Sequence, residues 1–106
     1  MQERRYQARL IRLIKKAYPG ALVLKNDPNY IQGIPDILVL YGNRWGALEV
    51  KQSLRAKRRP NQDYYIDLMG QMSFAAYICP ENEDEVLDAL QSALRINRAP
   101  RFPKSK

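Results

Sequence analysis

Apolar residues recur along this chain with two different spacings, which predict a mixture of helices and strands. Between Glu3 and Tyr18 they fall three and four positions apart on one stripe, which is typical of an amphipathic helix. Ile37 to Tyr41 is instead a continuous apolar run, as expected of an inner strand covered on both faces. The elements expected in chain order are a helix over Glu3–Tyr18, strands over Ala21–Lys25, Ile37–Tyr41 and Trp45–Lys51, a helix over Pro60–Met69, a strand over Phe74–Cys79 and a helix over Asn82–Leu94.

Turn residues punctuate these elements. The Pro19-Gly20 pair is expected to end the first helix, and Gly42-Asn43 predicts a hairpin between the second and third strands. Gly70 follows the second helix in the position that a C-terminal cap requires, so this helix is expected to close there. The boundaries are therefore predicted from glycine and proline as much as from the apolar pattern.

The order α-β-β-β-α-β-α predicts an α/β fold with a mixed four-stranded sheet flanked by helices, plus a C-terminal helix. A right-handed crossover through the helix from Pro60 would bring the last strand parallel to the third. The chain has 106 residues, enough for one hydrophobic core, and this domain is expected to span residues 1–96. Residues 97–106 hold two prolines and four bases, and are expected to form a basic tail outside the core.

The composition excludes several classes of protein and several kinds of catalytic site. No apolar run is long enough to cross a membrane and no signal peptide is evident, so we expect a cytoplasmic protein without a membrane partner. Cys79 is the only cysteine and histidine is absent, which excludes an internal disulfide, a cysteine-rich zinc site and catalysis by a histidine base. A catalyst built from this chain must use carboxylates, lysine and a hard metal ion.

The charge of the chain is strongly segregated. The net charge is +7, and residues 1–59 hold thirteen Lys and Arg against four Asp and Glu, whereas residues 60–94 hold seven acids and no base. A basic surface suggests a polyanionic partner such as DNA. Carboxylates within such a surface repel phosphate unless a divalent cation lies between them. The four acids in the basic part are Glu3, Asp27, Asp36 and Glu49.

The predicted hairpin brings two carboxylates and a lysine together at its open end. With a two-residue turn Asp36 lies opposite Glu49, and with a three-residue turn it lies opposite Val50; both registers place the two carboxylates within reach of one ion. Alternation along the strand points Lys51 to the same face as Glu49. Two carboxylates suit Mg²⁺ or Mn²⁺, and the lysine can orient water, help to deprotonate it or stabilise charge on a phosphate.

These residues resemble those of a known nuclease group. Gly33-Ile34-Pro35-Asp36, then Glu49-Val50-Lys51, then Gln62 look like the PD-(D/E)XK nuclease superfamily, and among its members the small stand-alone VRR-NUC type. The resemblance covers roughly residues 1 to 95, and it implies a restriction-endonuclease-like core, with which the expected element order agrees. It also implies a homodimer that resolves four-way junctions or cuts other branched DNA.

The resemblance completes the expected site. It implies that Glu3, early in the first helix, joins Asp36, Glu49 and the Val50 carbonyl as a ligand of Mg²⁺ or Mn²⁺. The catalytic residues are then expected to be Asp36, Glu49, Lys51 and Gln62. The arginine-rich loop before Gln62 departs from the Gly/Ser turn common in the group; its bases are expected to bind DNA phosphates, and they are Arg55, Lys57, Arg58 and Arg59.

Other interpretations of the same residues remain open. Pro35-Asp36 is also ordinary turn chemistry, Glu3 suits a helix dipole, and Gln62 suits a helix cap. The runner-up function is a non-catalytic basic DNA-binding module that keeps a nuclease-like fold, for which binding would be salt-sensitive and indifferent to Mg²⁺. A third interpretation is a subunit of a larger complex that docks through the acidic surface of residues 81–88.

Overall fold

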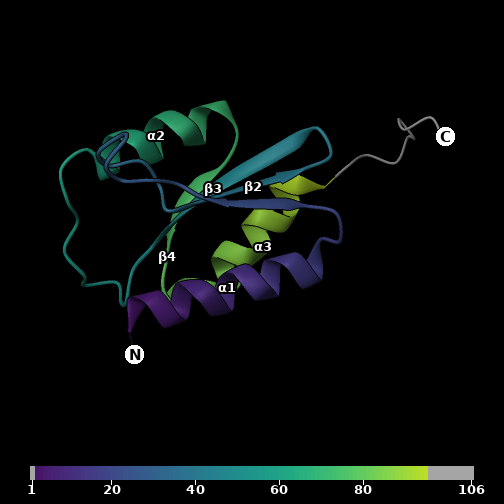
Figure 1. Ribbon diagram of the computed structural model, residues 1–106, viewed down its shortest axis with the longest axis horizontal. Coiled ribbons are helices and arrows are strands. Elements are labelled where there is room, and N and C mark those ends of the chain that lie inside the picture. The colour runs from purple at the N-terminus through teal and green to yellow at the C-terminus, as the bar shows by residue number, and fades with distance from the viewer. Residues whose placement is uncertain (1, 96–106) are drawn as a thin grey trace, which may run out of the picture.

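The computed structural model describes residues 2–95 and shows the α/β fold that the sequence predicts (Figure 1). The predicted tail over residues 97–106 lies outside the described residues. The strands form one sheet in the order β1-β2-β3-β4, with β1 to β3 antiparallel and β4 parallel to β3. The bounds are α1 Glu3–Ala17, β1 Leu22–Lys25, β2 Ile37–Tyr41, β3 Arg44–Val50, α2 Gln62–Met72, β4 Ala75–Ile78, a 3₁₀ turn Pro80–Asn82 and α3 Glu83–Leu94.

Helices cover the two faces of the sheet unequally. The core lies between the sheet and the pair α1 and α3, and it includes Leu10 and Leu90 from these helices with Val39 and Leu48 from the strands. On the opposite face α2 lies over β3 and β4 (Figure 1). Because α2 does not extend over β1 and β2, these two strands have no helix on this face, although α1 covers their other face.

Close packing on the core face requires a glycine in β3. A Cβ atom at Gly46 would lie 2.7 Å from Leu90 Cδ1 and 3.3 Å from Phe74 Cδ2, so the absence of a side chain lets α3 pack directly on the strand. This contact fixes α3 against the middle of the sheet.

One predicted boundary is wrong. Gly70 does not close α2, which continues through it to Met72 and ends at Ser73, whose backbone N–H bonds to the Met69 carbonyl. The positive φ that makes glycine favourable at a helix end occurs here at Gly20, Gly33 and Gly42. A glycine inside a helix is tolerated at a cost of about 1 kcal/mol relative to alanine, and the packing of α2 on β4 offsets it.

Candidate functional site

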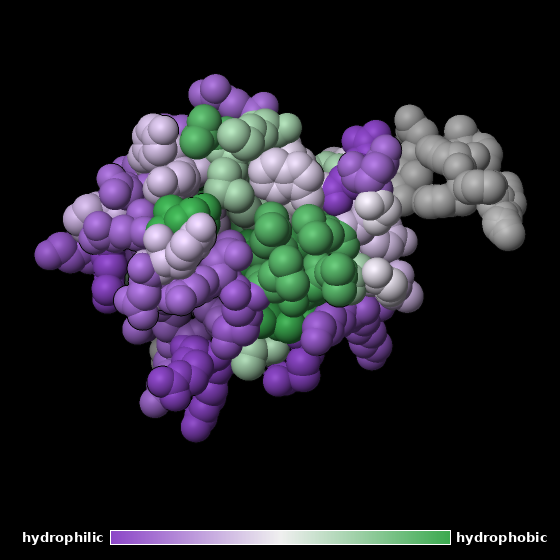
Figure 2. Space-filling model, turned by 45° about the horizontal axis from the view of Figure 1, so that its top comes forward, coloured by the Kyte–Doolittle hydropathy of each residue, from purple (hydrophilic) through white to green (hydrophobic). Residues whose placement is uncertain are grey.

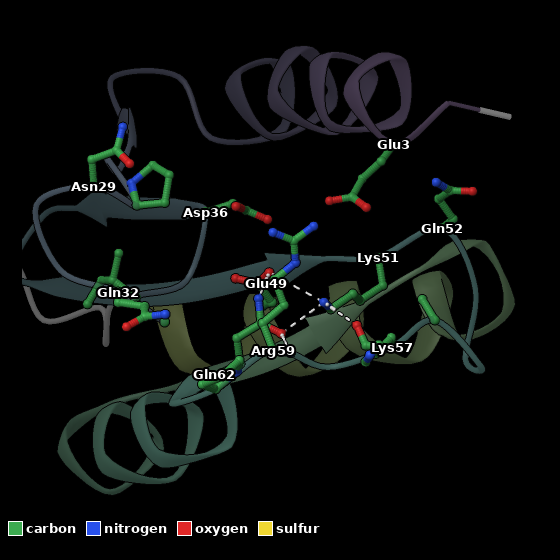
Figure 3. Close-up of a pocket in the computed structure, with 15 residues that line it drawn as sticks. Glu3, Asn29, Gln32, Asp36, Glu49, Lys51, Gln52, Lys57, Arg59 and Gln62 are labelled. Atoms are coloured by element: carbon green, nitrogen blue, oxygen red, sulfur yellow. Dashed lines mark hydrogen bonds and ion pairs between the residues drawn. The ribbon is translucent and has the colours of Figure 1, made fainter.

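A pocket of about 810 Å³ opens at the end of the sheet where β2 begins and β3 finishes (Figure 3). Five segments reach it: the first turn of α1, the loop between β1 and β2, the ends of the two central strands, the loop between β3 and α2 and the start of α2. The predicted site residues that line it are Glu3, Asp36, Glu49, Lys51, Lys57, Arg59 and Gln62. Residues far apart in the sequence, predicted to act together, are therefore neighbours.

The hairpin register is the one expected for a two-residue turn. Tyr41 pairs with Arg44 and Ile37 with Leu48, so that the next position outward brings Asp36 opposite Glu49. The Val50 N–H donates a hydrogen bond to Asp36 Oδ2 at 2.9 Å, which fixes the carboxylate at the start of β2. The structure thus gives Val50 a contact through its amide, and the role of its carbonyl as a metal ligand stays a prediction.

Glu49, Lys51 and Gln62 form a buried hydrogen-bonded network. Their exposed fractions are only 3%, 7% and 7%, unusual for two ionisable side chains. Gln62 Nε2 donates to Glu49 Oε2 at 2.8 Å, and Gln62 Oε1 accepts from Lys51 Nζ at 2.8 Å. Because the amide serves the carboxylate and the ammonium at once, Gln62 sets the distance between them, which is 4.0 Å from Lys51 Nζ to Glu49 Oε2.

Burial makes the carboxylates weaker acids. It raises the pKa of Glu49 to about 8, and the nearby Asp36 charge adds to this shift while Lys51 opposes it. Burial also raises the pKa of Asp36, against the lowering effect of the Val50 N–H. Two buried carboxyl groups that repel each other favour a shared proton or a cation between them.

Glu3 enters the pocket from the other side of the sheet. The start of α1 is tied to α3, because Tyr6 Oη donates to Glu83 Oε1 at 2.9 Å and Arg9 forms an ion pair with the same atom at 2.7 Å. Figure 3 shows the Glu3 carboxylate turned into the pocket. Burial, followed by the charge of Asp36, raises the pKa of Glu3, whereas Lys51 and Arg59 lower it. Glu3 is therefore electrostatically part of this site.

The carboxylate oxygens of the site are ligands of the kind that a hard divalent cation prefers, but they are not drawn closely together. Within residues 2–95, no group of three or more His, Cys, Asp or Glu side chains is gathered closely enough to hold a metal ion. One buried side-chain atom in this part of the chain lacks a hydrogen-bond partner, and it is Glu49 Oε1. An unpartnered buried carboxylate oxygen beside a second carboxylate is the arrangement that a cation would satisfy.

The four bases of the loop between β3 and α2 do not all reach the pocket. Lys57 and Arg59 line it, and Figure 3 shows the Arg59 guanidinium extending into it. Arg55 is exposed and lies outside the pocket lining. Arg58 makes an ion pair with Asp63 at 3.1 Å and stacks on the Tyr77 ring. Of the four bases predicted to bind DNA, two thus line the pocket, Arg55 is exposed away from it, and Arg58 is engaged in a surface contact with Asp63 and Tyr77.

Sequence reasoning missed the loop that forms the other wall. Asn29, Gln32 and Gly33 line the pocket, and the loop is ordered by a hydrogen bond from Asn29 N–H to Asp27 Oδ1 at 2.8 Å. Gly33, at φ +92°, packs on Asn61 so closely that a Cβ atom would lie 2.6 Å from the Asn61 Cβ. The dense turn chemistry of this segment signalled a turn, and nothing in it signalled contact with a helix start more than twenty-five residues later.

The chain matches no protein-family model, no curated protein and no solved structure. Across residues 2–95, no helix combines the length and the apolar character that crossing a membrane requires.

Proposed function

We propose that this protein is a structure-selective endonuclease, dependent on Mg²⁺ or Mn²⁺, that hydrolyses DNA phosphodiester bonds in four-way junctions or other branched DNA. The main support is the buried Glu49–Gln62–Lys51 network beside Asp36, in a pocket edged by bases. Burying a carboxylate and an ammonium costs free energy that an ordinary surface would avoid. This cost is understandable where both charges serve a reaction on a phosphate.

Each residue has a part in this proposal. Asp36 and Glu49 are the ligands of the cation, with Glu3 and the Val50 carbonyl completing the set. When bound, the cation polarises the phosphodiester and makes water more acidic. Lys51 Nζ has three N–H donors, of which Gln62 Oε1 and the Lys57 carbonyl accept two, at 2.8 and 3.0 Å. In this proposal the third donates to the phosphate or to the attacking water, and this would make Lys51 a catalytic residue.

The branched substrate and the dimer rest on the resemblance to the VRR-NUC nucleases. A surface is available for a second copy: Leu22 pairs with Leu40 and Leu24 with Leu38, which places the four leucines on the sheet face beside α2. Leu22 and Leu24 are 60% and 41% exposed, and Figure 2 shows a continuous apolar patch there. A two-fold dimer that forms through this patch would bury the patch of both copies. It would also provide two sites for a two-fold symmetric junction.

The proposed function is tested by incubating purified protein with labelled four-way junction, flap, duplex and single-stranded DNA, in Mg²⁺, in Mn²⁺ and in EDTA. Asp36→Asn is compared with Asp67→Asn, which removes the same charge from an exposed position of α2. We expect metal-dependent cutting of branched DNA that is lost in Asp36→Asn and kept in Asp67→Asn. Mn²⁺ should also raise the Tm of the wild type and have little effect on that of Asp36→Asn.

Non-catalytic DNA binding is the competing function. The observation that favours it is the open spacing of the carboxylates among residues 2–95, where no group of three ligands is assembled. It predicts salt-sensitive DNA binding that is unaffected by Mg²⁺ and by Asp36→Asn. Tight binding without cutting in either metal would replace the nuclease proposal with this one.

A further inference from the structure

Three side chains from separate segments form a closed cluster outside the pocket. Arg58, in the basic loop, lies with its Cζ 4.1 Å from the centroid of the Tyr77 ring on β4. The same guanidinium pairs with Asp63 Oδ1 on α2 at 3.1 Å. The Tyr77 hydroxyl donates a hydrogen bond to that oxygen as well. Arg58 is thus held by a charge from one side and an aromatic face from another.

The backbone on either side of Arg58 contacts the site directly. The Lys57 carbonyl accepts a hydrogen bond from Lys51 Nζ at 3.0 Å, and the Arg59 N–H donates to Gln62 Oε1 at 2.8 Å. These two contacts determine the directions of the Lys51 ammonium and the Gln62 amide (Figure 3). The residue between them is the one that the outer cluster fixes.

The loop has little else to order it near this point. Besides the Arg59 carbonyl, which accepts from the Gln62 N–H at 3.2 Å, its other hydrogen bonds are local ones around Ser53, whose carbonyl accepts from the Ala56 N–H at 3.2 Å and whose hydroxyl accepts from the Arg55 N–H at 3.3 Å. An exposed ion pair alone contributes too little to stability to fix a loop. The stacking on Tyr77 and the hydrogen bond between Tyr77 and Asp63 hold both partners of that pair in place. A tyrosine hydroxyl is an ordinary donor at neutral pH, and burial, with the adjacent Asp63, raises the pKa of the Tyr77 phenol further.

We propose that Asp63 and Tyr77 are positioning residues for catalysis: they anchor Arg58, and through it hold the backbone of residues 57–59 against Lys51 and Gln62. Arg58 then serves to order the loop, and the bases offered to DNA phosphate at the pocket are Lys57 and Arg59. The anchoring itself is independent of any activity, whereas its effect on turnover rests on the proposed nuclease function.

The anchoring is measured first without DNA. Amide exchange at Arg59 is followed by NMR in the wild type, in Arg58→Lys, which keeps the charge but loses the planar stack, and in Tyr77→Phe, which loses only the hydroxyl. We expect exchange at Arg59 to rise about tenfold in both variants while the core amide of Leu48 keeps its protection. Arg44→Lys and Tyr64→Phe are the matched controls, since both are exposed residues outside the cluster, and they should leave exchange unchanged.

Cleavage kinetics then test the consequence for the site. Arg58→Lys and Tyr77→Phe should lower kcat several-fold, with KM and the salt dependence of DNA binding unchanged, because no phosphate contact is lost. Unchanged exchange at Arg59 in Arg58→Lys would overturn the proposal, as would a loss of DNA affinity with normal kcat. If the wild type cuts no DNA while exchange rises as expected, the nuclease function fails and the anchoring is supported.

Discussion

Gln62 Oε1 accepts a hydrogen bond from Lys51 Nζ at 2.8 Å, joining the first residue of α2 to the residue that follows β3. The same oxygen also accepts the Arg59 N–H at 2.8 Å, and the amide nitrogen serves Glu49. One amide therefore uses its donor and its acceptor on the Glu49 carboxylate, the Lys51 ammonium and the backbone of the loop. Replacing it should disturb all three without removing any charge.

Gln62→Ala is expected to lower kcat by about 10- to 100-fold, the usual effect of removing a group that orients ligands and catalytic residues. Gln62→Glu would place a carboxylate beside Glu49 and should be at least as damaging. Gln71→Ala, at an exposed position near the end of the same helix, is the control. Single-turnover rates on branched DNA measure the effect. Activity near the wild-type level in Gln62→Ala would show that Lys51 and Glu49 are held by other contacts.

The raised pKa of Glu49, about 8, predicts a stability that falls with pH in the metal-free protein. Between the ordinary pKa near 4.5 and the folded value, the native state binds more protons than the unfolded state, so unfolding becomes easier as pH rises through this window. Glu49→Gln removes this effect and should raise the Tm at pH 8 more than at pH 5, while abolishing cleavage. Thermal unfolding in EDTA at both pH values, with exposed Glu85→Gln as control, measures it. Equal Tm gains at the two pH values would contradict the raised pKa.

The sequence predicted the elements, the mixed sheet and the nearness of Asp36 to Glu49 because these depend on local spacing, and it left two hairpin registers open. The two-residue turn at Gly42-Asn43 alone sets the register that brings Asp36 to Glu49. In contrast, the cluster of Arg58, Asp63 and Tyr77 joins three segments: the run of bases suggested a phosphate contact for Arg58, and no local pattern distinguishes Asp63 or Tyr77 from a solvated surface residue. The same limit applies to the pKa of Glu49, which depends on how deeply the folded chain buries the carboxyl group.

The glycine in β3 gives a test of the packing of α3. Gly46→Ala should lower the free energy of unfolding by about 1–3 kcal/mol, because the new methyl group would lie 2.7 Å from Leu90 Cδ1 in a fully packed core. Gly70→Ala is the matched change, since the nearest atom to its new Cβ is the Ala75 carbonyl oxygen at 3.9 Å. It should stabilise α2 by up to about 1 kcal/mol. Urea unfolding measures the free energy of unfolding of both variants. A change of the same sign in the two would contradict the close packing of α3 at Gly46.

The apolar patch on β1 and β2 predicts which substitutions would disrupt the proposed dimer. Leu22→Lys and Leu24→Lys should each convert a dimer to a monomer, because they place like charges on both sides of a two-fold interface. Leu54→Lys adds the same charge at a leucine in the basic loop that is about as exposed as Leu22, and should leave the dimer intact. Light scattering after size-exclusion chromatography measures the mass. A wild type that is monomeric at every concentration would remove the dimer from the proposal.

The bases at the pocket predict a specific salt dependence of DNA binding. Lys57 and Arg59 line the pocket, so each is expected to neutralise one phosphate. Lys57→Gln and Arg59→Gln, measured in EDTA to prevent cutting, should each reduce the slope of log K against log salt concentration by about 0.9. Arg44→Gln removes an exposed base at the hairpin turn, at the opposite end of β3 from the pocket, and should leave the slope unchanged. Equal effects of the three substitutions would mean that DNA is attracted by the overall charge of +7, and that the pocket has no special part in holding it.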